Sequence, residues 1–205
     1  ASECVTLLDN PHLAGSIASQ PFDGEGVATK VKKVIENGKL TTLLHNLKTA
    51  HKQGVQTTGS AARVSVAGPM TVAPSNFHFL ASDRGRDDLY LDAGNALLVT
   101  DLMGMHSGAN AISGDFSLAA RGFSIRDGKI DKPVDQITIA GNFFDLLKNI
   151  IAVGDDLEFG AGCFTSPTLL VEELGAIPRP YGIVKDEETA LAEKVKAAIE
   201  ECDMV

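Results

Sequence analysis

Two segments of the chain alternate apolar and polar residues on both sides of a short glycine-containing turn. In residues 27–47 the alternation flanks Asn37-Gly38, and in residues 122–134 it flanks Asp127-Gly128. Both pairs readily adopt the positive φ angles that a two-residue hairpin turn requires. The pattern therefore predicts two antiparallel hairpins.

Shorter runs of the same kind predict three more strands. They cover residues 62–68, where Val64 and Val66 fall on one face, residues 134–141 and residues 166–174. Alternation with a period of two is typical of a strand with one buried face. We therefore expect more strands than helices in this chain.

Apolar positions spaced by three and four residues predict three helices. The first covers residues 47–54 and ends at Gly54, and the second covers residues 142–154 and is capped by Asn142. The third covers residues 185–203 and carries acidic residues in its first turn. The expected buried positions are Phe143, Leu146, Leu147 and Ile150 in the second helix and Leu191, Val195, Ala198, Ile199 and Cys202 in the third.

The order of these elements indicates the fold class. Tight turns join most neighbouring strands, which favours antiparallel pairing. We therefore predict an α+β fold, with a curved, mostly antiparallel β-sheet and a few packed helices. Pro178 and Pro180 divide one domain, residues 1–177, from residues 178–205, a linker followed by the amphipathic helix. Because the chain opens on Ala1, we expect the first domain to be truncated at its N-terminus.

Composition and charge exclude several classes of protein. Of the 205 residues, 44% are hydrophobic and 22% are charged, which is typical of a globular domain. The net charge of −9 argues against direct contact with nucleic acid, because binding phosphates needs clustered cations. The one dense basic run, Lys30, Lys32 and Lys33, is predicted to be a solvated strand edge.

The cysteines and the hydropathy pattern indicate where the protein works. No apolar run is long enough to cross a bilayer, so we expect no contact with a membrane. Cys4, Cys163 and Cys202 are widely spaced and odd in number, which fits a reducing compartment better than a disulfide framework. We therefore expect a cytoplasmic protein.

The segment from Gly104 to Gly122 contains the residue types of a catalytic triad in a glycine-punctuated stretch. It lacks the GxSxG spacing of a nucleophile elbow, so we predict no catalytic residue in it. Two interpretations remain open: a turning strand whose polar side chains satisfy its own backbone, or a wall of a substrate groove. The candidate groove residues are His106, Ser107, Asn110, Ser113, Gly114, Asp115 and Phe116.

Metal binding has weak support in the sequence. The five histidines form no HExxH or HxxxH pair, so no self-sufficient zinc site is encoded. Cys163 lies in a glycine-rich loop and is the one candidate ligand or nucleophile, although a small buried apolar role is the main alternative. We therefore predict no metal site in this chain.

Four collinear strings carry a resemblance to a known family. They are LLDNPHLAGSIASQPFDGEGVATK, IENGKLTTLLHNLKTAHKQGVQTTGSAAR, GMHSGANAISGDFSLAARGFSIRDGKI and QITIAGNFFDLLKNIIAVGDDLEF. Together they resemble the C-terminal part of the PmbA/TldD family, also known as modulators of DNA gyrase. The resemblance covers the chain from about Cys4 to Leu174.

The resemblance implies a function. It implies an assembly of two related subunits, one catalytic and one non-catalytic. This assembly would act in the cytoplasm as a zinc-dependent peptidase on small or unfolded peptides, including antibiotic precursors and an antitoxin. The catalytic subunit type carries an HExxxH helix upstream and a cysteine in a loop similar to GTCGK.GQ. In this chain the corresponding loop reads GAGCFTSPTLL, and HSGANAISGDFS resembles the non-catalytic, PmbA-like (TldE) type.

From the resemblance we expect a non-catalytic subunit that shapes the substrate groove and the partner interface. Its partner would be a TldD-like catalytic homologue or a second copy of itself, and zinc would belong to the catalytic partner. The alternative is a catalytic metallopeptidase whose HExxxH motif lies upstream, with Cys163 completing the zinc site. Replacing Gly114 with valine is expected to impair peptide handling while leaving the fold intact.

Overall fold

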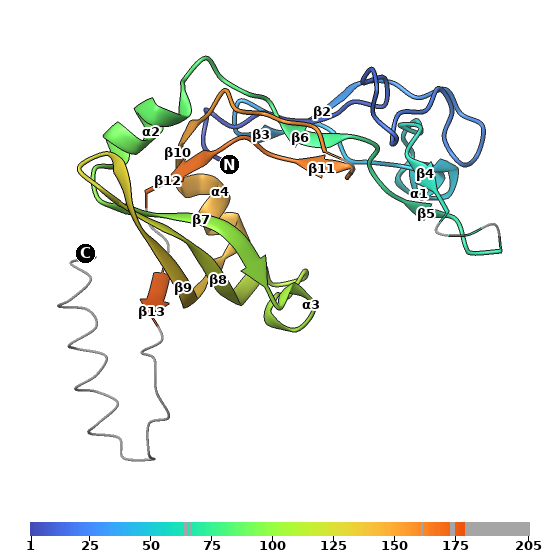
Figure 1. The fold of residues 1–205 in the computed structure, drawn as a ribbon. Coiled ribbons are helices and arrows are strands. Elements are labelled where there is room, and N and C mark those ends of the chain that lie inside the picture. Colours follow the sequence, from blue (N-terminus) through green and yellow to red (C-terminus); the bar gives the residue numbers. More distant parts are fainter. Residues whose placement is uncertain (64, 66, 161, 173–174, 179–205) are drawn as a thin grey trace, which may run out of the picture. The chain divides into compact units, whose positions relative to one another are not determined.

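The chain forms two compact units in the computed structural model, which describes residues 1–63, 65, 67–160, 162–172 and 175–178 (Figure 1). Unit 1 consists of residues 1–84 and 150–169, and unit 2 consists of residues 85–149 and the chain from residue 170 onward. Unit 1 is therefore built from two separate stretches of sequence. Pro178, where the linker was predicted to begin, belongs to a strand of unit 2, and the rest of the linker and the helix predicted at 185–203 lie outside the described residues.

Unit 1 is organised around a five-stranded sheet. The strand order is β11-β6-β1-β2-β3, and every neighbouring pair is antiparallel except β11 with β6, which is parallel. The hairpin predicted around Asn37-Gly38 is confirmed, because these residues have φ angles of 47° and 77° and join β2 to β3. The strands are β1 (Leu7–Asp9), β2 (Lys32–Glu36), β3 (Lys39–Leu40), β6 (Phe77–Phe79) and β11 (Phe164–Thr165).

The first predicted helix is confirmed as α1 (Leu47–Gln53) of unit 1. Asn46 caps it: the Asn46 side chain accepts a hydrogen bond from the Thr49 backbone N–H at 2.8 Å, and the Thr49 hydroxyl accepts one from the Asn46 N–H. Gly54 ends the helix with a left-handed φ of 69°. Beside it, β4 (Ala61–Ala62) pairs with β5 (Thr71–Val72).

The strand predicted at residues 62–68 is observed only at its start, in β4. Val64 and Val66, which the alternation places on one face, lie outside the described residues. The expectation that they share a buried face therefore stays a prediction.

Unit 2 contains a four-stranded antiparallel sheet in the order β13-β9-β8-β7. The predicted turn at Asp127-Gly128 is confirmed, with φ angles of 49° and 73°. The strand predicted at residues 134–141 belongs to the same hairpin, as the second half of its long return strand. The strands are β7 (Ala96–Met103), β8 (Asp115–Arg126), β9 (Lys129–Asn142) and β13 (Gly175–Pro178).

Backbone irregularities bend this sheet around Gly122, and the register of β8 with β9 also shifts between Phe123 and Ile125. The register of β7 with β8 shifts between Val99 and Asp101, and that of β8 with β9 shifts between Ala120 and Gly122. Gln136 of β9 has a φ of 56° at the same place. Such bulges increase twist and bend a sheet, so the predicted α+β fold with a curved antiparallel sheet is confirmed. One face of the sheet buries Leu118, Ala120, Ile137 and Ile139.

One predicted helix is shorter than expected, and several elements, strand β7 among them, were absent from the sequence prediction. The helix predicted over residues 142–154 ends early: α4 covers Phe143–Asn149, and Ile150–Val153 forms β10. The β-branched residues of that stretch favour a strand, where Ile150 is fully buried. Phe143 is half exposed rather than buried. Helix α2 (Arg86–Ala93) had no predicted counterpart.

The strand predicted at residues 166–174 is confirmed at its centre as β12 (Leu169–Val171). No helix within the described part of the chain has the length and apolar character needed to span a membrane.

Candidate functional site

The candidate segment begins where β7 ends in unit 2. Gly104, with a φ of +81°, turns the chain into the short helix α3 (Met105–Gly108). Helix α3 lies tightly against β8: a Cβ added at Gly108 would collide with the Ser117 carbonyl oxygen. Glycine is therefore required where the helix meets the strand.

Residues 109–115, named the exposed turn below, are held by hydrogen bonds across their own backbone. The Asn110 N–H donates to the Asp115 carbonyl at 2.8 Å, and the Gly114 N–H donates to the Asn110 carbonyl at 2.8 Å. The Asn110 side-chain oxygen accepts from the N–H groups of Ile112 and Ser113 at 2.9 and 3.2 Å. Asn110 thus fixes the turn from inside.

Asn142, the last residue of β9, fixes the exposed turn from outside. Its side-chain NH₂ donates to the Ser113 carbonyl at 2.9 Å and to Oδ1 of Asp115 at 2.8 Å. Its side-chain oxygen accepts from the Phe144 N–H at 2.9 Å. The sequence pattern identified Asn142 only as a helix cap, and no local signal pointed to its contacts with residues so distant in sequence.

Gly114 has no room for a side chain. Its φ is +83°, and an added Cβ would lie 2.8 Å from the Phe144 ring and 3.1 Å from Oδ1 of Asn142. Valine is strongly disfavoured at such a φ. The expectation that Gly114→Val leaves the fold intact is therefore wrong, and other substitutions are needed to test this segment.

Asp115 presents a fixed negative charge at the end of the turn. Hydrogen bonding to Ser113 and to Asn142 holds the pKa of the Asp115 carboxyl below its ordinary value, because both stabilise the ionised form. Across the residues that the structure describes, no lysine, arginine or histidine pairs with this carboxylate. Its charge is left facing solvent.

The structure brings some of the candidate groove residues together and separates others. Asn110, Ser113, Gly114 and Asp115 meet in the exposed turn, whereas His106 and Ser107 lie on α3. In the described part of the chain, no hydrogen bond links His106 to a serine or a carboxylate. A catalytic triad is therefore not assembled here.

Phe116 and the backbone next to it belong to the sheet. Phe116 packs against the buried core of unit 2, on the opposite face from Asp115. Strand β8 is paired on both sides, with Asp115 opposite Asn142, Phe116 opposite Gly141, and Ala109 bridging to Phe116. Strand β7 is at the edge of this sheet. Among the strands that the structure describes, main-chain pairing with an added peptide is thus open at β7 rather than at β8.

Cys163 is a half-buried free thiol in unit 1. Its carbonyl accepts the Phe77 N–H at 2.7 Å beside β11. Among the described residues, no group of three histidine, cysteine, aspartate or glutamate side chains could hold a metal ion. Within that part of the chain, Cys163 therefore has no set of companion ligands.

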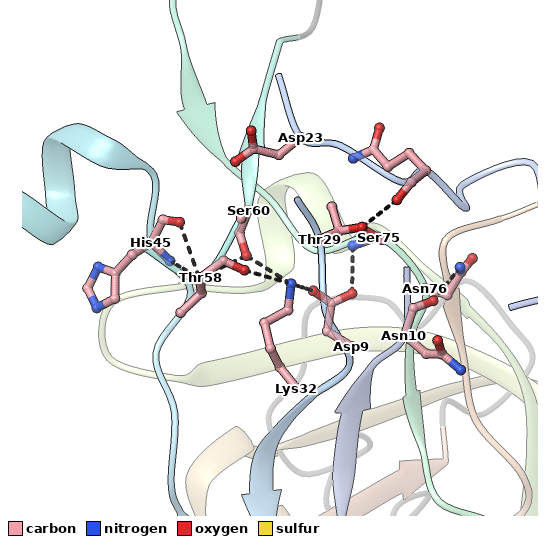
Figure 2. A network of polar contacts seen from close by, with 12 residues as sticks. Asp9, Asn10, Asp23, Thr29, Lys32, His45, Thr58, Ser60, Ser75 and Asn76 are labelled. Carbon is pink, nitrogen blue, oxygen red and sulfur yellow. Dashed lines mark hydrogen bonds and ion pairs between the residues drawn. The ribbon is translucent and has the colours of Figure 1, made fainter. Parts of the chain in front are cut away.

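A buried polar network in unit 1 was missed by the sequence analysis (Figure 2). The Lys32 ammonium lies 2.9 Å from Oδ2 of Asp9, and the two side chains are 2% and 0% exposed. Oδ1 of Asp9 accepts the Ser75 N–H at 2.8 Å, and Lys32 donates to the Ser60 hydroxyl at 3.2 Å and to the Thr58 carbonyl at 3.4 Å. Asp9 and Lys32 are named the buried pair below.

The expectation of a solvated basic strand edge is wrong for Lys32. Lys33 and Lys30 are exposed, but Lys32 shares a face of β2 with half-buried Val34. A period-two pattern through Val34 was the one signal that could have indicated its burial.

The same network fixes two loops of unit 1. Thr58 accepts the His45 N–H at 2.6 Å, and its hydroxyl lies 3.0 Å from that of Ser60. Asp23 is buried and accepts backbone N–H groups of Glu25, Val27 and Ala61 at 2.9 to 3.0 Å. These bonds satisfy polar groups that burial would otherwise leave without partners.

The contact of Lys32 with Ser60 does not form a catalytic dyad. A lysine that activates a serine must be neutral, whereas Lys32 is in an ion pair with Asp9. Ser60 is also buried, at 4% exposure, so a substrate has no access to it. The network holds loops in place and offers no reacting group to solvent.

Comparison with known proteins connects this fold to a family. Residues 1–177 match the family model described as the PmbA/TldA metallopeptidase C-terminal domain. The chain is 36% identical over 168 residues to the Escherichia coli O157:H7 protein named metalloprotease PmbA, covering 82% of this chain and 35% of that protein. It is 39% identical over 165 residues to the Haemophilus influenzae PmbA homologue, covering 80% and 34%.

Solved structures give the same result. A proposed modulator of a DNA gyrase from Thermotoga maritima superposes with a TM-score of 0.79 at 40% identity, covering 85% of this chain and 39% of that one. TldE from Thermococcus kodakarensis superposes with a TM-score of 0.75 at 26% identity, covering 82% and 38%. The chain spans about a third of the length of the curated relatives it matches.

Proposed function

Because the chain belongs to the PmbA/TldD metallopeptidase family and matches its C-terminal domain, we propose that it is part of a PmbA/TldE-like, non-catalytic subunit of a cytoplasmic peptidase complex. The complex degrades or matures small or unfolded peptides, and a TldD-like homologue supplies the catalytic zinc. This chain contributes a wall of the peptide groove and part of the subunit interface.

Support for the peptidase part comes from the named relatives. The Escherichia coli protein and a Methanothermobacter thermautotrophicus protein that is 36% identical over 164 residues are both named metalloproteases. Support for the TldE-like role comes from the resemblance to Thermococcus TldE and from the HSGANAISGDFS segment.

The observation that carries the groove proposal is the construction of the exposed turn. Side-chain and backbone hydrogen bonds from Asn110 and Asn142 fix it, yet it presents Ile112 with 94% of its surface exposed. A fixed surface with exposed apolar and polar side chains loses little conformational freedom when a ligand binds. This is the property that a peptide-binding wall needs.

The edge of β7 supplies the second part of the groove. An extended peptide gains affinity by adding a strand to an open sheet edge. Strand β7 ends at Met103, immediately before the segment that leads into the exposed turn. A peptide paired along β7 would therefore continue toward α3 and the turn.

The described residues do not fit a zinc site. Zinc needs three or four converging histidine, cysteine or carboxylate ligands, and no such group of three is present among them. No step of the proposed function is therefore assigned to a metal held by this part of the chain.

Ile112→Ser tests the role of the exposed turn. Because the side chain is already exposed, the fold is unaffected, and we expect the KM for an unstructured fluorogenic peptide to rise roughly three- to tenfold in the reconstituted complex. The value of kcat and the bound zinc should stay unchanged. The matched control is Ile17→Ser, since Ile17 of unit 1 is 81% exposed. An unchanged KM in the Ile112 variant would refute the groove role.

The alternative function is a self-sufficient metallopeptidase whose HExxxH motif lies upstream. Cys163 would then complete its zinc site. Zinc analysis of the isolated full-length protein and of its Cys163→Ser variant separates the two functions. Stoichiometric zinc that Cys163→Ser removes favours the alternative, and a protein without zinc favours the non-catalytic subunit.

A further inference from the structure

The exposed turn holds the Asp115 carboxylate in place, and the exposed ring of Phe144 lies against the neighbouring Gly114. Asp115 is held at Oδ1 by the Asn142 side chain at 2.8 Å, and Asn142 in turn accepts the Phe144 N–H. The Phe144 ring lies 2.8 Å from where a Cβ on Gly114 would be, and Phe144 remains 51% exposed. Ile112 projects from the same turn. A negative charge and the Phe144 ring are thus held close together at one turn, and Ile112 is exposed on the same turn.

The charge of Asp115 has no cationic neighbour to neutralise it within the described residues. The contrast with Asp145 on α4 is instructive, because Asp145 is paired with Lys148 at 2.8 Å. Asp101 on β7 is similarly paired with Arg121 at 2.8 Å. Asp115 receives hydrogen bonds only from neutral groups, and these keep its carboxyl ionised.

We infer that Asp115, with Ile112 and Phe144, forms a subsite for a cationic group of a peptide that lies next to an apolar side chain. This inference rests on the proposed function and names the substrate chemistry that the groove prefers. A carboxylate held in place pays less ordering cost on pairing with an ammonium than a freely rotating one. The net charge of −9 adds a long-range attraction for cationic peptides.

The shared chemistry is a positive charge, which can come from a lysine or arginine side chain or from a peptide N-terminus. Three short, C-terminally labelled peptides distinguish these sources. The first is acetylated and carries one lysine between leucines, the second is its acetylated glutamine twin, and the third is the glutamine twin with a free N-terminus. Fluorescence anisotropy with the full-length protein at low salt gives the Kd of each.

We expect the lysine peptide, the peptide with a free N-terminus, or both to bind about fivefold more tightly than the acetylated glutamine twin, as for a single exposed ion pair. Asp115→Asn should abolish this preference, because asparagine can still accept the hydrogen bond from Asn142 while lacking the charge. Asp145→Asn removes the same net charge from an already paired carboxylate and should leave the preference intact. A gain by the lysine peptide assigns the side chain as the source, and a gain by the free N-terminus assigns the terminal ammonium.

Equal Kd values for all peptides, or a preference that survives Asp115→Asn, would overturn the inference. The reconstituted complex distinguishes this failure from failure of the proposed function. If the complex cleaves the lysine and glutamine peptides equally well, and Ile112→Ser raises the KM for both, the groove proposal is supported and the charge subsite is refuted. If Ile112→Ser changes nothing in the cleavage assay, the groove itself is refuted.

Discussion

Both units contain networks of short polar contacts, but the network is buried in unit 1 and exposed in unit 2. In unit 1 the buried pair and its serine and threonine partners are sealed from solvent, and each bond is to another part of the protein. In unit 2 the exposed turn is fixed by equally short hydrogen bonds, but the carboxylate of Asp115 and the side chain of Ile112 face outward. A network of polar groups therefore indicates a binding surface only where it leaves a charged or apolar side chain unpaired and accessible to solvent.

This difference also separates stability from function. Removing one member of a buried pair leaves an uncompensated charge in a low-dielectric interior, which costs folding free energy. Changing an exposed side chain on a fixed turn leaves the core unchanged and, under the proposed function, removes a contact with the peptide. Substitutions in unit 1 should therefore act on unfolding, and substitutions at the tip of the turn should act on peptide handling.

The largest effect is expected from Lys32→Met. It strands the buried Asp9 carboxylate, and the free energy of unfolding should fall by about 3–5 kcal/mol. Chemical denaturation of the full-length protein measures this loss. Lys33→Met, which breaks only the exposed pair with Glu36, is the control and should cost less than about 1 kcal/mol.

A second variant sharpens this result. Adding Asp9→Asn to Lys32→Met removes the stranded charge while keeping an acceptor for the Ser75 N–H. Much of the lost stability should return. Equal losses for Lys32→Met and Lys33→Met would show that the buried pair is not sealed as described.

Gly114→Ala should have an intermediate effect on stability. The strained φ and the collision with the Phe144 ring together should cost about 2 kcal/mol of unfolding free energy. Gly104→Ala is the matched control, since its φ of +81° is nearly the same but nothing lies within 4 Å of an added Cβ. Its cost should be about 1 kcal/mol. Thermal unfolding of the two variants measures the difference. Equal losses of stability would show that the Phe144 ring makes no steric contribution.

The smallest global effect is expected from Asn142→Ala. The lost bonds are on an exposed turn, so the free energy of unfolding should fall by only about 1 kcal/mol. Amide hydrogen exchange should nevertheless accelerate at Phe144, whose N–H loses its acceptor. Exchange that is unchanged at Phe144 would contradict the fixation of the turn by Asn142. Lys148→Ala at the far end of α4 is a control that leaves these bonds in place.

Local sequence signals predicted much of the fold. The turns at Asn37-Gly38 and Asp127-Gly128 need positive φ angles, which asparagine, aspartate and glycine tolerate, so both hairpins were identifiable. Helix α1 was identifiable because Gly54 provides its left-handed end. These features depend on neighbours within a few positions.

Features that depend on distant contacts were not predictable in this way. The burial of Lys32 is explained by Asp9, and the role of Asn142 by the turn around Ser113, each separated by more than 20 positions. The β10 strand overrode a helical pattern because Ile150 fits a buried site in unit 1. The sequence identifies the candidate segment only as a polar stretch punctuated by glycines, whereas its division between exposed turn and interior strand depends on the sheet register.

The proposed function makes this chain part of the non-catalytic subunit of a peptidase. The most direct measurement is a mild pull-down of the tagged full-length protein, with mass spectrometry of the proteins that co-elute and of their zinc content. We expect a stoichiometric homologue that bears an HExxxH motif and holds the zinc. Recovery of the tagged protein alone, with its own stoichiometric zinc and peptidase activity, would contradict it.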